Sequence, residues 1–243
     1  MRSNREWQAW GRMDPLWSVA SWDGKQRNGP SPWTPGELLA LGAADFRDVL
    51  RHWRHFGMTP GTCVEIGCGA GRMTTQLVTV FETVAALDVS ADQIDLARQL
   101  LGPKASAVQF YQVNDPAIPL SNHRCTAMFS CHVFQHFSRF EGVTRYLQET
   151  FRVLASGGTV CFHIPVPGAH RGVLISSVRL ALHNASVTAR RMLGGRRVMQ
   201  YHRYSARTIF DTLKAIGFRD AELRVFDMTS NGDAHSFFFA RRP

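Results

Sequence analysis

Short apolar runs alternate with longer amphipathic segments along most of this chain. The apolar runs have the length of buried strands and lie at residues 64–66, 84–87, 108–113, 126–131, 159–163, 221–226 and 235–240. The amphipathic segments favour helices at residues 35–44, 45–56, 72–78, 90–99, 142–154 and 205–216. Several of these begin at a Ser or Thr cap or end at a glycine. Strands that alternate with helices predict an α/β fold with a doubly wound sheet.

Two stretches break the alternation and divide the expected single domain, residues 1–243, into parts. Residues 1–58 precede the first strand and contain all six tryptophans, which predicts a Trp-rich N-terminal helical cap. The tryptophans are expected to pack this cap against the sheet, or one or two of them to close over a ligand pocket. Residues 168–204 follow the fifth strand and carry an apolar stripe at helical spacing, which predicts a basic helical lid insertion. The core is then residues 59–167 and 205–243.

The most informative stretch follows the first strand and has the sequence VEIGCGAGRMT, residues 64–74. Gly67, Gly69 and Gly71 allow a tight turn and a close approach of the backbone to a ligand. A strand, a glycine turn and a helix start together form a nucleotide site. A dinucleotide fingerprint requires its third glycine at position 72, where this chain has Arg72. Glu65 would repel a pyrophosphate, but it suits a cationic ligand.

This E-x-G-x-G-x-G stretch resembles motif I of class I S-adenosylmethionine-dependent methyltransferases, whose cofactor carries a sulfonium and an amino group. Asp88 lies twenty-one residues after Gly67, close to the spacing of the carboxylate that holds the ribose hydroxyls. The string FRVLASGGTV resembles the helix, glycine turn and fifth strand of the same family. The resemblance implies a Rossmann-like, seven-stranded sheet and S-adenosyl-L-methionine as the cofactor. The residues it implies for cofactor binding are Glu65, Gly67, Cys68, Gly69, Gly71, Asp88, Val89, Asn114, Asp115 and Cys131, with Asp115 on the adenine.

Histidines near the expected acceptor position are the candidate catalytic groups. His132 and His136 follow the fourth strand and share one face if that segment is helical. Histidine titrates near neutral pH, which suits a general base. By resemblance to some small-molecule O-methyltransferases, His136 is the base and His132 lies near the acceptor, although a structural role for either one stays open. His163, Tyr201 and His202 are expected to bind the substrate. No carboxylate cluster accompanies these histidines, so no metal ligands are expected.

Missing motifs narrow the acceptor class that the resemblance implies. The fourth strand ends in FSCH, residues 129–132, without the Asp/Asn-Pro-Pro-aromatic motif of methyltransferases that modify DNA bases. The aspartates of the catechol type and the paired-glutamate loop of the protein arginine type are also missing. These absences favour a metal-independent methyltransferase that acts on an oxygen or nitrogen of a small or lipid-like acceptor. Two alternatives stay open: an RNA methyltransferase, and a protein that binds the cofactor without transferring its methyl group.

Charge is distributed unevenly along the chain, whose formal net charge is +9. Residues 150–210 contain no Asp or Glu but nine arginines. This asymmetry predicts an acceptor, or its carrier, that bears a carboxylate or phosphate, or a substrate drawn from an anionic membrane surface. The same segment lacks the interleaved aromatic residues of a base-stacking surface, which argues against nucleic acid as the partner.

The remaining composition fits an ordinary cytoplasmic domain. At 243 residues, 44% of them hydrophobic, the chain can bury a full α/β core. No apolar run approaches eighteen residues, so no transmembrane helix is expected, while peripheral contact with a membrane stays open. The N-terminus lacks the apolar core of a signal peptide. The five scattered cysteines are expected to be buried free thiols, and the sequence does not reveal the oligomeric state.

Overall fold

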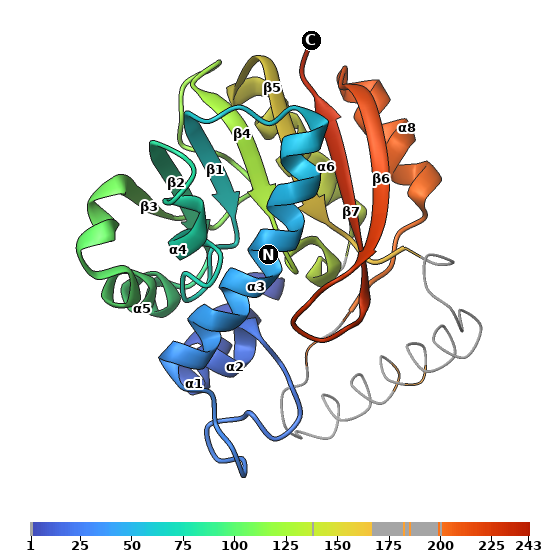
Figure 1. Ribbon diagram of the computed structural model, residues 1–243. Coiled ribbons are helices and arrows are strands. Elements are labelled where there is room, and N and C mark those ends of the chain that lie inside the picture. Colours follow the sequence, from blue (N-terminus) through green and yellow to red (C-terminus); the bar gives the residue numbers. More distant parts are fainter. Residues whose placement is uncertain (1, 138, 167–181, 183–184, 186–198, 200) are drawn as a thin grey trace.

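A seven-stranded sheet forms the centre of the molecule (Figure 1). The computed structural model describes residues 2–137, 139–166, 182, 185, 199 and 201–243. The strand order is β3-β2-β1-β4-β5-β7-β6. β7 runs antiparallel to its neighbours β5 and β6, and the other paired strands are parallel. The doubly wound, seven-stranded sheet that the sequence predicted is therefore confirmed.

All seven expected strands are present, with small differences in their bounds. They are β1 (Thr62–Ile66), β2 (Thr83–Asp88), β3 (Val108–Gln112), β4 (Cys125–Ser130), β5 (Leu154–His163), β6 (Arg219–Asp227) and β7 (Ala234–Arg241). β5 begins before the turn that was expected at residues 155–158. Leu154 already pairs with Cys125, and the register then shifts before Ala127 pairs with Thr159. The glycines of the expected turn thus form an irregular part of the strand.

The helices among the described residues connect these strands and precede the first of them. They are α1 (Arg2–Met13), α2 (Pro15–Val19), α3 (Pro35–Phe56), α4 (Thr74–Leu77), α5 (Ala91–Leu101), α6 (Phe140–Val153) and α8 (Ala206–Ile216), with short 3-10 segments η1 (Gly102–Ala107) and η2 (Phe134–His136). α3 is one continuous helix where two were expected, because the junction Ala43-Ala44 contains strong helix formers and no breaker. α4 has only four residues, so the helix after the glycine turn is shorter than predicted.

The two faces of the sheet are covered by different helices, as Figure 1 shows. α3, α4 and α5 cover one face, where buried Trp53 packs against Phe129 and donates its indole N–H to Thr159 at 2.9 Å. α6 and α8 cover the other face. Successive residues of β1 point to opposite faces of the sheet. Cys63 packs on the face covered by α3, α4 and α5, and Val64 packs on the face covered by α6 and α8. Both faces of the parallel strands are therefore apolar, which explains the short uninterrupted apolar runs in the sequence.

The N-terminal helices lie against the carboxyl edge of the sheet and against α5. Gln8 of α1 donates a hydrogen bond to the carbonyl of Val89 at 3.1 Å. Gln93 of α5 donates to the Ser18 hydroxyl at 2.7 Å. The division into cap, core and lid stays a prediction, since most of residues 168–204 lie outside the described residues.

Two composition-based expectations concern the whole chain. All five cysteines are free thiols as predicted, and all of them except Cys131 are buried. Within the described part of the chain, no helix combines the length and the apolar character needed to cross a membrane.

Candidate active site

A cavity of about 1050 Å³ opens at the carboxyl ends of the parallel strands. It lies where the strand order reverses between β1 and β4, the position at which open α/β sheets bind ligands. The glycine turn and the end of β2 form one part of its lining, and the residues after β4 and β5 form another. The N-terminal helices and the loop between β6 and β7 complete it.

The glycine turn forms part of the cavity wall and holds conformations that other residues adopt only with strain. Gly67 has φ of 77°, and a Cβ there would lie 2.3 Å from Val133. Gly69 has φ of 51°, and a Cβ there would lie 2.5 Å from Val19 of α2. Gly71, with φ of 82°, faces α5 instead and does not line the cavity. The first two glycines therefore leave room for Val133 and Val19 beside the turn, and the third lets the turn pack on α5.

Glu65 projects from the end of β1 into the same cavity. Its side chain accepts a hydrogen bond from the Thr74 hydroxyl at 2.6 Å, and the residue is 2% exposed. Burial raises the pKa of this carboxyl to about 7, because the charged form loses its hydration. A cationic ligand group would stabilise the ionised form.

Asp88 joins the end of β2 to the glycine turn. Its two carboxylate oxygens accept hydrogen bonds from the backbone N–H of Gly69 at 2.8 Å and of Ser90 at 2.9 Å. Burial raises the pKa of Asp88, while these hydrogen bonds oppose that shift. Each carboxylate oxygen can accept about two hydrogen bonds, so capacity remains for a ligand in the cavity.

The other residues expected to bind the cofactor divide into two groups. Three line the cavity: Cys68, Val89 and Cys131. Three others do not: Gly71, Asn114 and Asp115. Asn114 and Asp115 are exposed on the surface, and the Asn114 carbonyl accepts a hydrogen bond from Asn4 at 2.5 Å. Contact of Asp115 with the adenine therefore stays a prediction.

Cys131 has an environment that makes it a poor nucleophile. Burial raises the pKa of its thiol to about 12, so the reactive thiolate is scarce near neutral pH. A place in the cavity wall therefore fits Cys131 better than covalent chemistry.

His132 and His136 both line the cavity, but they do not share a helix face as the sequence suggested. His132 has a left-handed backbone with φ of 60°, and His136 ends the short segment η2. The His136 ring lies edge-on to Trp7, with centroids 4.6 Å apart, and 4.9 Å from the Tyr201 ring. Burial and the neighbouring His163 lower the pKa of His132 well below its usual range, so this ring is neutral at physiological pH.

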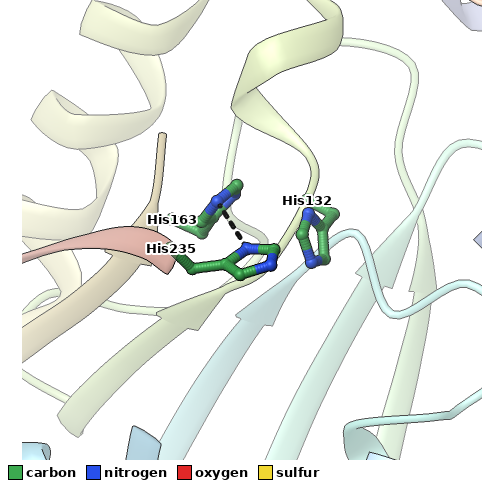
Figure 2. Close-up of side chains that lie close together, drawn as sticks. All are labelled: His132, His163 and His235. Carbon is green, nitrogen blue, oxygen red and sulfur yellow. Dashed lines mark hydrogen bonds between the residues drawn. The ribbon is translucent and has the colours of Figure 1, made fainter. Parts of the chain in front are cut away.

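Three histidines from separate strands form a cluster in the cavity (Figure 2). His132 follows β4, His163 ends β5, and His235 lies at the start of β7. His235 Nδ1 and His163 Nε2 are 3.3 Å apart, and the His132 ring centroid lies 4.3 Å from that of His163. The sequence analysis missed His235. The signal was present, because an antiparallel last strand must start beside the carboxyl end of its neighbour.

The two remaining predicted substrate residues take different positions. Tyr201 lines the cavity, and its hydroxyl lies 3.1 Å from that of Ser21. His202 is absent from the lining, and its backbone N–H donates to the Gln135 carbonyl at 2.7 Å. Burial lowers the pKa of the His202 ring. A structural role therefore fits His202 better than substrate contact.

Other residues of the lining were not singled out from the sequence as site residues. Trp7 and Trp22 line the cavity, which fits the expectation that one or two tryptophans close over a ligand pocket. Trp53 lies in the core, which fits the expectation that tryptophans pack against the sheet. Arg72 also lines the cavity, and its guanidinium forms a buried ion pair with Asp45 of α3. Arg72 directly follows the glycine turn in the sequence, so its place in the site could have been predicted.

Comparison with known proteins gives a family and a set of related folds. A family model described as a methyltransferase domain matches residues 64–162, which span most of β1 to β5. No curated protein matches the sequence. Among solved structures, 1189 chains match.

Three of these structures illustrate the range. Phosphoethanolamine N-methyltransferase 2 of Haemonchus contortus, solved with phosphomonomethylethanolamine and S-adenosylhomocysteine, is 17% identical with a TM-score of 0.60. The match covers 87% of this chain, which spans only 58% of that protein. Magnesium protoporphyrin IX methyltransferase of Synechocystis PCC 6803, solved with S-adenosylhomocysteine, is 14% identical with a TM-score of 0.61, over 99% and 100% of the two chains. An S-adenosylmethionine-dependent methyltransferase of Aquifex aeolicus is 17% identical with a TM-score of 0.56, over 86% and 98%. At such identities the match shows the fold alone.

Proposed function

We propose that this chain is a class I S-adenosylmethionine-dependent methyltransferase that methylates an oxygen or nitrogen of a small or lipid-like acceptor. The observation that carries the proposal is the cavity that the glycine turn and the histidines share. Pockets of about 300–1,000 Å³ hold a drug-sized molecule. A cavity of about 1050 Å³ has room for the cofactor and a small acceptor side by side.

The residues of β1 and β2 would hold the cofactor. Glu65 would pair with its ammonium group, which favours the ionised carboxylate in a buried site. Asp88 would accept hydrogen bonds from the ribose hydroxyls while it holds the Gly69 backbone in place. Gly67 and Gly69 would let the backbone lie against the methionine part.

Methyl transfer is an in-line displacement in which the acceptor atom bonds to the methyl carbon as the carbon–sulfur bond breaks. S-adenosylhomocysteine leaves, and a hydroxyl acceptor also loses its proton. His136 is our candidate for the base that takes this proton. The rings of Trp7 and Tyr201 lie against His136 and would restrict its orientation.

The more specific part of the proposal is that the acceptor carries negative charge. The nine arginines and the missing acidic residues of 150–210 support it. The Haemonchus structure, in complex with a small phosphate-bearing amine, supports the same acceptor class on a related fold. We also propose that residues 168–204 cover the mouth of the cavity. The sequence further predicts that the reaction needs no metal, and the histidine cluster gives a reason to reconsider that part.

The test is methyl transfer from S-adenosylmethionine labelled on its methyl group. The acceptors offered are defined panels of small phosphate-bearing amines, carboxylic acids and phenols, together with a folded RNA. We expect label on a small acceptor and none on the RNA. Label on the RNA would favour the alternative RNA methyltransferase. Binding of S-adenosylhomocysteine by calorimetry, without transfer to any acceptor, would favour a non-catalytic binding protein.

A further inference from the structure

We propose that His132, His163 and His235 bind one divalent transition-metal ion of the zinc class, with an open coordination position that faces the cavity. The second part of this inference rests on the proposed function: the open position would take an oxygen of the methyl acceptor. Figure 2 shows the three side chains, which come from the ends of three different strands.

The distances between the ring nitrogens suit a shared ion. One ligand nitrogen from each histidine lies within 4.8 Å of the other two. With metal–nitrogen bonds of about 2.0–2.1 Å, a tetrahedral ion holds its nitrogens roughly 3.4 Å apart. The pair formed by His163 Nε2 and His235 Nδ1 already has this separation, at 3.3 Å. The rings must still turn so that the lone pairs of all three nitrogens point to one ion.

Backbone pairing between the strands, rather than contact between the rings, keeps the cluster in place. His163 pairs with Phe237 in the antiparallel ladder between β5 and β7, which brings the start of β7 beside the end of β5. His132 follows β4, which runs parallel to β5. Its left-handed φ of 60° is an uncommon conformation for a histidine. Such local strain tends to persist where it serves a site.

The type of ligand indicates the class of ion. Imidazole nitrogen suits zinc, copper, iron and nickel, whereas magnesium and calcium prefer oxygen ligands. Three protein ligands with one open position are the usual arrangement of a catalytic zinc ion. The three histidines line the cavity together with Asp227 and Asp233, which supply negative charge to its wall.

A hydrogen bond between His163 and His235 is the arrangement expected when the metal is absent. When an ion takes Nδ1 of His235, the ring proton moves to Nε2. That atom lies 3.4 Å from Nδ2 of Asn231, which is itself a donor, so the Asn231 amide must turn to offer its oxygen to the protonated ring. A polar partner on the second ring nitrogen is the usual way in which proteins orient a metal-binding histidine.

A metal at this position would act on the acceptor side of the reaction. A bound ion attracts an oxygen of a carboxylate, phosphate or hydroxyl and lowers the pKa of a hydroxyl group. The glycine turn and Glu65 line the same cavity, so an acceptor held at the histidines shares a chamber with the cofactor. The expectation of no metal rested on the lack of a carboxylate cluster beside the histidines, and it did not consider His235 as a third ligand.

The test uses cobalt(II) as a probe, since its visible absorption reports tetrahedral coordination. The full-length protein is stripped with a chelator and titrated with Co²⁺ or Zn²⁺, without cofactor. We expect one ion per chain, displacement of Co²⁺ by Zn²⁺, and loss of the spectrum in His235→Asn. Removing a ligand should weaken binding by more than the roughly 10–100-fold cost of losing a second-shell partner.

Two further variants keep the result interpretable. His132→Asn removes a ligand, while asparagine tolerates the left-handed backbone, so folding should survive. Exposed His55→Asn is the matched control and should bind as the wild type does. Thermal melting checks that each variant is folded. Equal metal binding by wild type and His235→Asn, or no stoichiometric binding by the wild type, would overturn the proposed site.

The open position is tested on the Co²⁺-loaded protein with inorganic phosphate and, separately, acetate. A spectral change with either anion supports an accessible position, and which anion acts distinguishes phosphate from carboxylate acceptors. No change with either anion overturns the open position. Calorimetry with S-adenosylhomocysteine on the metal-free protein separates the two proposals. If the protein binds S-adenosylhomocysteine but has no metal site, only this inference fails. If the metal site is present but S-adenosylhomocysteine does not bind, the proposed function fails and the metal site itself stands.

Discussion

The two sides of the cavity are built in opposite ways. The donor wall, which consists of Glu65, Gly67, Gly69 and Asp88, comes from residues 65–88 and is held by hydrogen bonds within that stretch. The histidine wall, which consists of His132, His136, His163 and His235, collects residues spread over residues 132–235. Only the folded sheet makes neighbours of His132, His163 and His235.

This difference explains why the cofactor was predictable and the acceptor was not. The donor wall would bind a ligand through glycines and carboxylates that all belong to one short stretch of the sequence, so a motif can identify them. Gly67 and Gly69, for example, have positive φ angles that other residues adopt only with strain. The histidine wall binds through side chains whose mutual distances depend on strand pairing. The following predictions test the two walls separately, from the largest expected effect to the smallest.

His136→Ala should have the largest effect on turnover and little effect on the donor wall. If the acceptor is a hydroxyl, losing the base should lower turnover by about 10²–10⁴-fold. Affinity for S-adenosylhomocysteine should stay near that of the wild type. Steady-state kinetics and calorimetry measure the two quantities, and His55→Ala is the exposed control. Full activity in His136→Ala would mean that proximity alone suffices or that His132 is the base. A mild loss would indicate an amine acceptor that is already deprotonated.

Glu65 should make cofactor affinity depend on pH. Its carboxyl has a pKa of about 7 in the ligand-free protein. In the proposed function, the cofactor ammonium would pair with the ionised form. Affinity for S-adenosylmethionine should therefore fall as pH drops below about 7, by up to tenfold per pH unit. Calorimetric titration from pH 5 to 8 measures this slope. Glu65→Gln should bind more weakly and show a flat profile, and an identical slope in the variant would remove Glu65 from the interaction.

The stability of the ligand-free protein should change with pH in the opposite direction. The folded pKa of Glu65 is raised above its usual value of 4.5, so its contribution to stability is fully present below about pH 4.5 and is lost as pH rises through 7. The loss amounts to about 3 kcal/mol. Glu65→Gln, which can still accept the Thr74 hydrogen bond, should unfold at higher denaturant than wild type at pH 8. The gain should disappear near pH 5, and a gain of the same size at both pH values would contradict the assigned pKa.

Asp88→Ala should weaken cofactor binding through both of its roles. The variant would lose the proposed ribose contacts, and it loses the hydrogen bonds from Gly69 and Ser90 that shape the turn. Hydrogen bonds to a charged group contribute about 1.5–3 kcal/mol each, so a loss of roughly tenfold or more is expected. Asp95→Ala, which removes an exposed carboxylate on α5, is the control and should bind normally. Unchanged affinity in the Asp88 variant would exclude it from the donor wall.

The smallest effect is expected from the basic segment, residues 168–204. Arg190→Gln/Arg191→Gln, at positions outside the described residues, should raise the Michaelis constant of an anionic acceptor by a few fold. Exposed charges contribute about 0.2–1 kcal/mol and are screened within about 8 Å at physiological salt. Kinetics from low to high salt, in wild type and double variant, measure the effect. If neither salt nor the substitutions change the constant, the acceptor is neutral.

The structure also shows where the sequence analysis was incomplete. The two histidines after β4 were expected on one helix face, but His132 turns into a left-handed conformation and joins His163 instead. Asp115 was assigned to the adenine by resemblance, yet it lies on the surface and does not line the cavity. Both assignments depended on backbone direction just after a strand, where a single dihedral angle redirects the following side chains.

The sequence by itself determined the α/β order, the seven strands, the glycine turn and the cofactor. These features follow from periodicity and from steric rules that act within a few residues, as at Gly67 and Gly69. Only the tertiary structure decided which histidines meet. The antiparallel pairing of β7 with β5 sets His235 beside His163, seventy-two residues earlier in the chain. Strand pairing is a non-local interaction whose register depends on the whole sheet, so no local pattern around His235 records its partners.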